Sequence, residues 1–260
     1  MPVIPGLGWT FDTVAATYEK LRPGYVEALY QDIFAYRPLD AASHAVEVGI
    51  GGGQATGPIL ATGCAVTAVE PGANFCALCR EKFAAYPGFT AVNARFEDVD
   101  LPPESCDLVY SASAFHWVPE EIGYRKVFDI LRPGGAFARF ANHPFKDKGR
   151  PGMHEALQEV YAIYMPGSLV PNEYSEEQAA RRAAIAAKYG FTDIQHRLYR
   201  RTRDFTAAEY VQLLGTYSDH IAIEEKTRGR FFREIGEAID RLGGRITIYD
   251  TIDLQLARKP

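Results

Sequence analysis

A run of closely spaced glycines directly behind an apolar stretch is the feature that most limits how this chain can fold. The segment Glu47-Val48-Gly49-Ile50-Gly51-Gly52-Gly53 ends an apolar run at residues 44–48 and precedes a helix-like segment at 54–61. Glycines in such a place allow a tight turn and let a ligand approach the backbone closely. Open α/β sheets bind nucleosides in a crevice at the carboxyl ends of their strands. The glycines are also compatible with a purely structural turn, so other signals must decide.

Strand-sized apolar runs alternate with helical segments through the first half of the chain. The runs lie at residues 44–48, 65–69, 89–93, 107–111 and 136–141, and the helical segments lie at 54–61, 73–85 and 120–131. This alternation predicts an α/β fold with a mostly parallel sheet that carries helices on both faces. Later strands are expected at 194–203 and 245–257, which makes seven. The other predicted helices lie at 22–36, 153–164, 175–189, 206–215 and 228–242.

Glu70 is the second signal of a nucleoside site. It stands roughly 20 residues after the glycines, at the end of the second apolar run, where a carboxylate can accept hydrogen bonds from both ribose hydroxyls. The alternative is an ordinary solvated acid at a strand end. A nicotinamide site would need the pattern G-x-G-x-x-G, but Gln54 stands where its third glycine belongs. The spacing here is E-x-G-x-G-x-G instead.

Five motifs, in order along the chain, resemble class I S-adenosylmethionine-dependent methyltransferases. The match extends from Tyr18 to about Ala141, and it implies a Rossmann-like fold with S-adenosylmethionine as the cofactor. Residues 47–53 resemble the first motif of the family. The others are Val69-Glu70-Pro71, the adenine-loop motif Arg95-Phe96-Glu97-Asp98-Val99-Asp100-Leu101-Pro102, the strand Asp107-Leu108-Val109-Tyr110-Ser111, and the turn Leu131-Arg132-Pro133-Gly134-Gly135.

The resemblance implies a role for each matching position. Glu70 would bind the ribose, and Glu47 would help to hold the amino-acid end of the cofactor. Arg95 stands where family members often have a short acid that faces the adenine amino group, and arginine cannot accept that hydrogen bond. The further implied cofactor contacts are Gly49, Gly51, Gly53, Pro71, Arg95, Phe96, Glu97, Ser111 and Ala112.

Three shorter motifs are similar to one branch of the family, which includes trans-aconitate methyltransferase-like proteins. They are the Y-x-x-x-R-P-x-Y pattern at residues 18–25, Ala114-Phe115-His116-Trp117, and Gly215-Thr216-Tyr217-Ser218. The first of them adds Tyr18 and Arg22 to the expected cofactor contacts. Trp9, Phe11 and Tyr18 form either a lid over the methyl donor or a short helix packed on the sheet.

Histidine and aromatic residues near the predicted crevice are candidates for the acceptor side. Methyl transfer from a sulfonium is an in-line displacement, so alignment and exclusion of water are the main tasks. His116 lies next to the predicted crevice and is the candidate general base for a hydroxyl, phenol or ammonium acceptor, whereas a carboxylate acceptor needs no base. Its alternative role is to orient the substrate or to cap the strand end. Trp117, His143 and Tyr217 are the predicted substrate contacts.

Composition favours a small molecule as the acceptor. The net charge of −5 disfavours nucleic acid and anionic membranes as partners. The chain has no apolar run of membrane-spanning length and no signal-peptide pattern in its first residues, so we expect a cytoplasmic enzyme. The leading hypothesis is methyl transfer to a small molecule, on a carboxylate or a hydroxyl. The alternatives are an RNA or protein methyltransferase and a non-catalytic S-adenosylmethionine-binding protein. The sequence does not indicate an oligomeric state.

Two further patterns are expected to be structural. Cys76 and Cys79 form a C-x-x-C within a predicted helix, where residues three apart share a face. No second pair supplies the remaining ligands of a zinc site, so we expect packed free thiols and no metal. The arginine-rich stretch at 197–203 is compatible with binding of an acidic substrate or RNA, but in an acidic chain we expect it to protect an edge strand.

The chain is expected to form a single domain over residues 1–260. Within it we expect an N-terminal helical cap at 1–40, a cofactor-binding core at 41–145, a helical insertion at 146–190, and C-terminal strands and helices at 191–260. Insertions at the rim of such a sheet usually shape substrate pockets.

Overall fold

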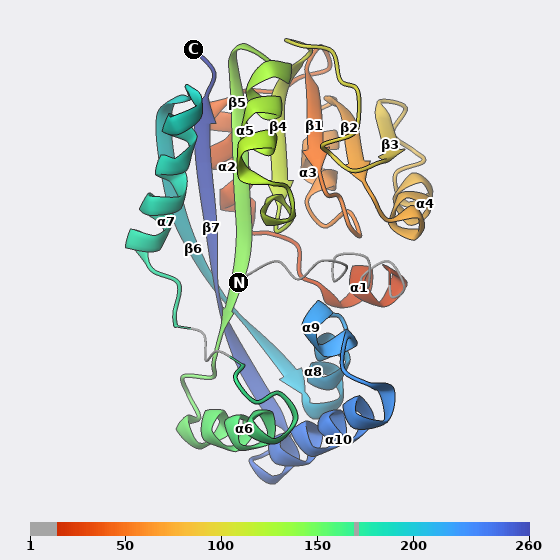
Figure 1. Cartoon of the computed structure of the whole chain (residues 1–260), viewed down its shortest axis with the longest axis vertical. Coiled ribbons are helices and arrows are strands. Elements are labelled where there is room, and N and C mark those ends of the chain that lie inside the picture. Colours follow the sequence, from red (N-terminus) through yellow and green to blue (C-terminus); the bar gives the residue numbers. More distant parts are fainter. Residues whose placement is uncertain (1–14, 169–171) are drawn as a thin grey trace. The chain divides into compact units, whose positions relative to one another are not determined.

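A seven-stranded sheet organises the chain, as the sequence predicts. The computed structural model describes residues 15–168 and 172–260. Every strand pair from β3 to β5 along the sheet is parallel. The strands follow the order β3 (Phe89–Asn93), β2 (Ala65–Glu70), β1 (His44–Val48), β4 (Cys106–Ala112), β5 (Leu131–Phe145), β7 (Arg245–Arg258) and β6 (Thr192–Thr206) (Figure 1).

The strand order reverses at β1, and this reversal determines where a ligand can bind. The chain runs outward from β1 to β2 and β3, and then returns to place β4 on the other side of β1. Val46 is paired with Thr67 on one side and with Val109 on the other. The loops that leave β1 and β4 therefore diverge in opposite directions and leave a crevice at the carboxyl ends of these strands.

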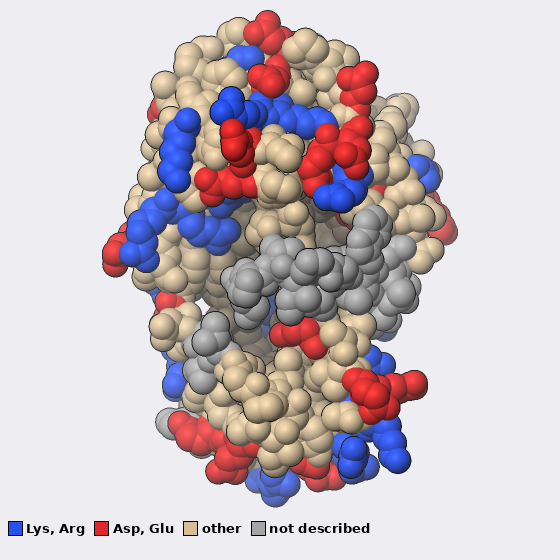
Figure 2. Space-filling model, viewed as in Figure 1, with Lys and Arg blue, Asp and Glu red and all other residues tan. Residues whose placement is uncertain are grey.

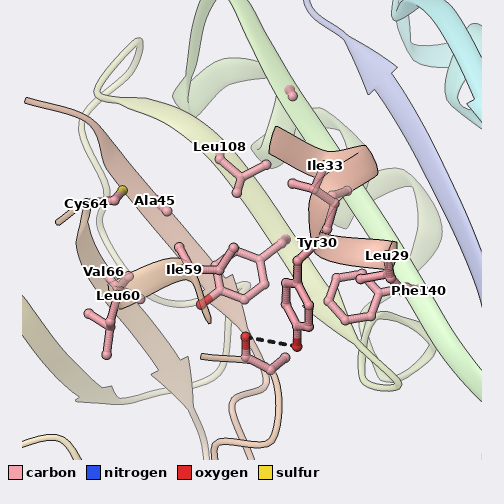
Figure 3. Packing of buried hydrophobic residues seen from close by; sticks show 14 of the residues in the cluster. Leu29, Tyr30, Ile33, Ala45, Ile59, Leu60, Cys64, Val66, Leu108 and Phe140 are labelled. Carbon is pink, nitrogen blue, oxygen red and sulfur yellow. Dashed lines mark hydrogen bonds between the residues drawn. The ribbon is translucent and has the colours of Figure 1, made fainter. Parts of the chain in front are cut away.

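Successive side chains of the central strands point alternately into two hydrophobic cores, one on each face of the sheet. Ala45 of β1 lies in the first core with residues of α2 (Glu27–Tyr36) and α3 (Thr56–Leu60) (Figure 3). Val46, the next residue, lies in the second core with residues of α5 (Glu120–Ile130). This two-residue period matches the alternation of side chains along a strand, and it explains helices on both faces.

Two predicted boundaries are wrong, and both involve proline and glycine. The helix predicted at 22–36 begins later than expected, because Pro23-Gly24 stays outside it and α2 starts at Glu27; α1 (Ala15–Leu21) is a separate helix that ends before this proline. The predicted turn at 131–135 is already part of β5, which pairs with β4 through a register shift between Cys106 and Leu108. Gly134 there has a φ of 77°, a value that glycine adopts without strain.

The remaining helices mostly follow the predictions. The 3-10 helix η2 (Phe115–Trp117) follows β4, and η3 (Ala184–Tyr189) continues from α7. The α-helices are α4 (Ala73–Lys82), α6 (Pro151–Tyr164), α7 (Glu176–Ala183), α8 (Ala207–Leu214), α9 (Ser218–Ile221) and α10 (Glu225–Arg241).

The chain divides into two compact units. The first comprises Met1–Arg22, His143–Tyr174 and Arg200–Thr251, and the second comprises Pro23–Asn142, Ser175–Tyr199 and Ile252–Pro260. Trp9 and Phe11 lie outside the described residues, so a lid built from them stays a prediction. The domain boundaries at residues 40, 145 and 190 also stay predictions. Among the described residues, no helix is both long and apolar enough to cross a membrane.

In the first unit, helices α6, α8 and α10 surround a core of their own. Phe231 and Ile235 of α10 are fully buried there. A chain of hydrogen bonds runs from Asp219 through the His220 ring to the Tyr161 hydroxyl, with distances of 2.7 and 2.9 Å. These two hydrogen bonds provide partners for both ring nitrogens of His220, which is buried.

The arginine-rich strand β6 lies at an edge of the sheet, as expected. The arginines Arg201 and Arg203 are not simply edge-blocking charges, however. Both bind the fully buried carboxylate of Asp250 in β7, at 3.1 and 2.5 Å. Asp250 interrupts the apolar pattern of the last strand because it neutralises these two guanidinium groups.

Asp107 holds together the amino-terminal ends of the central strands in the second unit. Its buried carboxylate accepts hydrogen bonds from the His44 backbone N–H at 2.9 Å, from Arg37 at 2.6 Å and from Arg132 at 2.7 Å. Burial alone would raise the pKa of Asp107, but these three donors hold it below its usual range.

Asp107→Asn should therefore destabilise the fold. An amide offers one acceptor oxygen in place of two, so one guanidinium loses its partner, and we expect a loss of about 2 kcal/mol in the free energy of unfolding. Urea unfolding at neutral pH measures the loss. The control is Glu121→Gln, which removes an exposed pair with Arg125 and should cost less than about 0.5 kcal/mol. Equal effects of the two variants would contradict this role for Asp107.

Candidate cofactor and acceptor site

The glycine-rich turn behind β1 has a conformation and a packing that require glycine. Gly49, Gly51 and Gly53 have φ values of 74°, 51° and 72°, which other residues rarely adopt. A Cβ atom at Gly49 would lie 2.4 Å from the Cβ of Ala114, and one at Gly53 would lie 2.7 Å from the Phe83 ring. The turn therefore packs against two segments at once, and side chains are excluded from it.

Glu70 ends β2 beside this turn and is buried, so it is not a solvated acid at a strand end. The residue is only 8% exposed to solvent. One carboxylate oxygen accepts from the Gly51 N–H at 3.0 Å, and the other accepts from the Gly72 N–H at 2.9 Å. These two bonds fix the orientation of the carboxylate next to the turn, and a carboxylate oxygen can accept more than one hydrogen bond. Pro71, the next residue, is half-buried.

Glu47 is fully buried under the same turn. Its Oε2 accepts hydrogen bonds from the Thr56 hydroxyl at 2.7 Å and from the Tyr110 hydroxyl at 2.8 Å. Its Oε1 has no hydrogen-bond partner among the described residues. Burial raises the pKa of Glu47 to about 7, against the two hydrogen bonds, and the nearby charge of Glu70 raises it further.

The predicted adenine loop follows β3. The Phe96 side chain is buried in the core on the face of the sheet that α5 covers. Only the backbone of Phe96 can therefore contact a ligand. The exposed guanidinium of Arg95 binds Glu97 at 2.6 Å. Lys126 of α5 donates hydrogen bonds to the backbone oxygens of Glu97 and Val99, and it thereby fixes the path of this loop.

The end of β4 adjoins the glycine-rich turn. The buried hydroxyl of Ser111 donates to the backbone oxygen of Val48 at 2.8 Å, directly before the turn. Ala112 is half-buried, and Ser113 follows with a positive φ of 56°. The Ser113 hydroxyl lies 2.9 Å from the hydroxyl of Tyr25. The chain thus bends sharply at this point and carries the next residues over the turn.

A small pocket opens beyond this bend, and its enclosed space is about that of one water molecule. His116, on the 3-10 helix η2, is exposed and lies on its wall. The wall combines two guanidinium groups, an imidazole and one carboxylate with small and aromatic side chains. Its lining residues are Ser111, Ser113, Ala114, Phe115, His116, Arg139, Phe140, Ala141, Arg182, Asp253 and Gln255.

Besides Ser113, four polar residues of this pocket are not among the predicted site residues. Arg139 lies in β5 between buried apolar residues, and its guanidinium donates to the Tyr124 hydroxyl at 2.5 Å. Asp253 and Gln255 of β7 are buried and hydrogen-bonded to each other, and Arg182 comes from α7. A charge inside an apolar strand is the signal that points to Arg139 and Asp253. No pattern in the sequence singles out Arg182.

Aromatic candidates beside His116 have different surroundings. Trp117 is half-buried, with its ring centre 5.0 Å from that of His116. Phe115 packs in the core against Tyr124 and Phe137, so it is a core residue that also reaches the pocket.

The other predicted site residues lie in the first unit. The guanidinium of Arg22 donates to the Thr216 side chain at 3.0 Å and to its backbone oxygen at 2.8 Å, and it stacks 4.1 Å from the centre of the Tyr217 ring. Tyr18 lies on another side of this guanidinium, at 5.0 Å. Two of the short branch motifs, at 18–25 and 215–218, are therefore in direct contact. His143 stacks on Tyr174 with ring centres 3.7 Å apart.

The C-x-x-C pair is buried on one face of α4, as predicted. Cys76 and Cys79 are both fully buried free thiols. Burial raises the pKa of Cys79 to about 12, so this thiol stays protonated at neutral pH. Across residues 15–168 and 172–260, no group of three or more histidine, cysteine or carboxylate side chains could hold a metal ion.

Comparison with known proteins agrees with this geometry. Residues 46–139 match a methyltransferase domain. An uncharacterised methyltransferase of Geobacillus kaustophilus is 30% identical over 162 residues, which cover 58% of this chain and 73% of the relative. The chain belongs to the methyltransferase family.

Solved structures share the fold of this methyltransferase. A protein of Anaeromyxobacter dehalogenans described as a type II methyltransferase has a TM-score of 0.63 at 20% identity, with 92% of this chain and 98% of that chain covered. A phosphoethanolamine N-methyltransferase of Haemonchus contortus, in complex with S-adenosylhomocysteine, has a TM-score of 0.55 at 16% identity. That match covers 96% of this chain and 57% of the other. The protein is a class I enzyme with S-adenosylmethionine as its cofactor.

The residues at the glycine-rich turn fit this cofactor. The buried Oε1 of Glu47 needs a donor, and the amino-acid end of S-adenosylmethionine carries an ammonium group. The Cβ-free turn lets a ligand approach the backbone, and Glu70 presents a fixed carboxylate next to it. When bound, S-adenosylmethionine supplies a methyl group activated by the positive charge on its sulfur.

Glu47 makes the stability of the ligand-free methyltransferase fall as the pH rises. Its folded pKa of about 7 lies above the usual value near 4.3, so the native state keeps a proton that the unfolded chain has released. The stabilisation is fully present below the pKa that Glu47 has in the unfolded chain. It is lost as the pH rises to the pKa of Glu47 in the folded protein. Between pH 5 and pH 8 the loss in the free energy of unfolding is roughly 2–3 kcal/mol.

Glu47→Gln should remove this contribution, because an amide does not titrate. Urea unfolding of both proteins at pH 5 and pH 8 tests the prediction. We expect the wild type to lose more stability between the two pH values than the variant loses, by the amount given above. Parallel pH profiles of the two proteins would show that Glu47 titrates normally in the folded state.

Proposed function

We propose that this enzyme transfers a methyl group from S-adenosylmethionine to the carboxylate of a small molecule that binds at the mouth of the pocket beyond β4. The observation that carries the proposal is the contact of Ala114 with Gly49. Ala114 lies on the pocket wall and touches the turn assigned to the cofactor, so the two sites share a boundary. An acceptor at the mouth of the pocket would therefore face the cofactor directly, as an in-line displacement requires.

The pocket wall supports an anionic acceptor. It combines the guanidinium groups of Arg139 and Arg182 with the imidazole of His116, against the single carboxylate of Asp253. A planar guanidinium matches a carboxylate with two parallel hydrogen bonds. The positive side chains would hold the acid and orient one of its oxygens. The short motifs at 18–25, 114–117 and 215–218, which resemble those of trans-aconitate methyltransferase-like proteins, agree with an acid as the acceptor.

A carboxylate acceptor reduces the chemical demand on the protein. It is already deprotonated at neutral pH, so no residue has to remove a proton. His116 then serves to orient the acceptor, and the aromatic side chains of Phe115 and Trp117 exclude water. A hydroxyl acceptor would require His116 or Asp253 as the base, and this is the outcome that the test below separates from the proposal.

The proposed cofactor contacts follow the family pattern on the second unit. Glu70 would bind the ribose, the turn of Gly49, Gly51 and Gly53 would pack against the cofactor, and Glu47 would meet its amino-acid end. The adenine loop and the end of β4 would complete the site through Pro71, Arg95, Phe96, Glu97, Ser111 and Ala112. Tyr18 and Arg22, and the substrate contacts His143 and Tyr217, stay predictions.

The surface is compatible with a small diffusible acceptor. On the face shown in Figure 2, lysine and arginine side chains are interspersed with aspartate and glutamate side chains. Nucleic-acid binding uses a continuous basic patch or stripe, and the net charge of −5 opposes it.

Arg182→Met tests the acceptor site. With a panel of small mono-, di- and tricarboxylic acids, the release of S-adenosylhomocysteine measures turnover. For an acid that is methylated, we expect the variant to raise the KM of the acid about tenfold or more, because a charge-assisted hydrogen bond is lost. The affinity for S-adenosylhomocysteine should not change.

Arg181→Met is the matched control. Arg181 is the neighbouring arginine on α7, and it is exposed and paired with Glu177 at 2.8 Å. Its loss should leave the KM of the acid unchanged. Methylation of alcohols or amines that carry no carboxylate, at rates equal to those of the acids, would contradict the proposal.

A further inference from the structure

Two side chains of helix α4 bind the backbone of the glycine-rich turn from the side of the helix. The Cys79 thiol donates to the Gly51 backbone oxygen at 3.2 Å, and the Lys82 ammonium donates to the Gly52 backbone oxygen at 3.0 Å. The following residue, Phe83, packs against Gly53. Three successive residues of the turn are thus contacted by three residues at the C-terminal end of α4.

These contacts fix the peptide planes of the turn. In a trans peptide the C=O and the next N–H point in opposite directions. Because Gly51 O is bound to Cys79 and Gly52 O to Lys82, the following N–H groups point away from α4. The Gly51 N–H is held separately by Glu70. The Gly53 N–H donates to the Ile50 backbone oxygen at 3.0 Å, which restrains the same peptide from its other end. Glycine has access to more backbone conformations than any other residue, so the loss of the contacts from α4 would leave these peptides with fewer restraints.

Lys82 makes the stronger of the two contacts. A thiol is a weak hydrogen-bond donor, whereas an ammonium group forms a charge-assisted bond to a carbonyl oxygen. Lys82 is also exposed, and Cys79 is fully buried. Replacing Lys82 therefore removes the bond to Gly52 without opening a cavity, which makes it the residue to test.

We propose that Lys82, assisted by Cys79, is a positioning residue that holds the glycine-rich turn in the conformation that binds S-adenosylmethionine. It acts through the Gly52 carbonyl and touches no reacting atom. The proposal rests on the proposed placement of the cofactor over this turn. It also gives Cys79 of the C-x-x-C pair a function in the cofactor site that is neither metal binding nor redox chemistry.

Lys82→Met separates this role from general stability. In the ligand-free protein, hydrogen exchange of the Gly51 and Gly53 amides should become about tenfold faster, because both amides lie in the turn that Lys82 holds. Calorimetry should show S-adenosylhomocysteine binding weakened about three- to tenfold. The KM for S-adenosylmethionine should rise by a similar factor, and kcat should stay within about twofold.

Two further variants complete the experiment. Lys82→Arg keeps a cationic donor and should restore most of the affinity and the slow exchange. Lys188→Met removes an exposed lysine, paired loosely with Glu120 at 3.8 Å, and should leave both measurements unchanged.

The proposal would be overturned if Lys82→Met and the wild type had equal hydrogen-exchange rates in the turn and equal affinity for S-adenosylhomocysteine. A different result would separate the two proposals. If the wild type exchanged slowly and Lys82→Met exchanged fast, but the protein bound no S-adenosylhomocysteine, Lys82 would still hold the turn. The proposed placement of the cofactor would then be refuted.

Discussion

Gly49 and Ala114 are packed so closely that a methyl group on Gly49 would lie 2.4 Å from the Ala114 side chain. This contact joins the segment that follows β1 to the segment that follows β4. It exists because the strand order reverses at β1, which places the two strands side by side and sends their following loops in different directions. The glycine-rich turn, the pocket beyond β4 and the boundary between them all depend on this arrangement.

Buried carboxylates fix the geometry around this contact, and each does so in a different way. Glu70 accepts two backbone N–H groups and stays next to the turn. Glu47 lies fully buried under it with one oxygen lacking a partner among the described residues, which suits a cationic ligand group. Asp107 is neutralised by two arginines at the amino-terminal ends of the strands, away from the glycine-rich turn. Structural stability and ligand binding therefore involve different acids of the same sheet.

Side chains from the neighbouring helices complete the preorganisation of the loops. Lys82 of α4 binds the glycine-rich turn, and Lys126 of α5 binds the backbone of the adenine loop. Backbone carbonyls that are already bound to a lysine do not have to be reoriented when a ligand arrives. A rigid site loses less conformational entropy on binding, which favours affinity.

The sequence predicts the first three strands well because they are short apolar runs with glycine or proline directly beside them. The run at 44–48 is β1 without change, and the glycine spacing behind it is decisive for the class of cofactor. The last strand is predicted to within one residue. The sequence does not predict the full extent of β5 and β6, because these strands continue past the predicted segments into polar residues. It also does not predict that Arg182 and Asp253 meet at one pocket, since they come from α7 and β7 and no local pattern links them. Lys82 was missed for the same reason, because its partner is a backbone oxygen 30 residues away.

The central claim is that this turn and Glu70 bind S-adenosylmethionine, and calorimetry with S-adenosylhomocysteine tests it most directly. We expect one site in the wild type and no binding of a nicotinamide dinucleotide. Glu70→Ala should weaken binding by about 1.5–3 kcal/mol, which is the usual contribution of hydrogen bonds to a charged group. Binding of the dinucleotide alone, or equal S-adenosylhomocysteine affinity in the wild type and Glu70→Ala, would contradict the account.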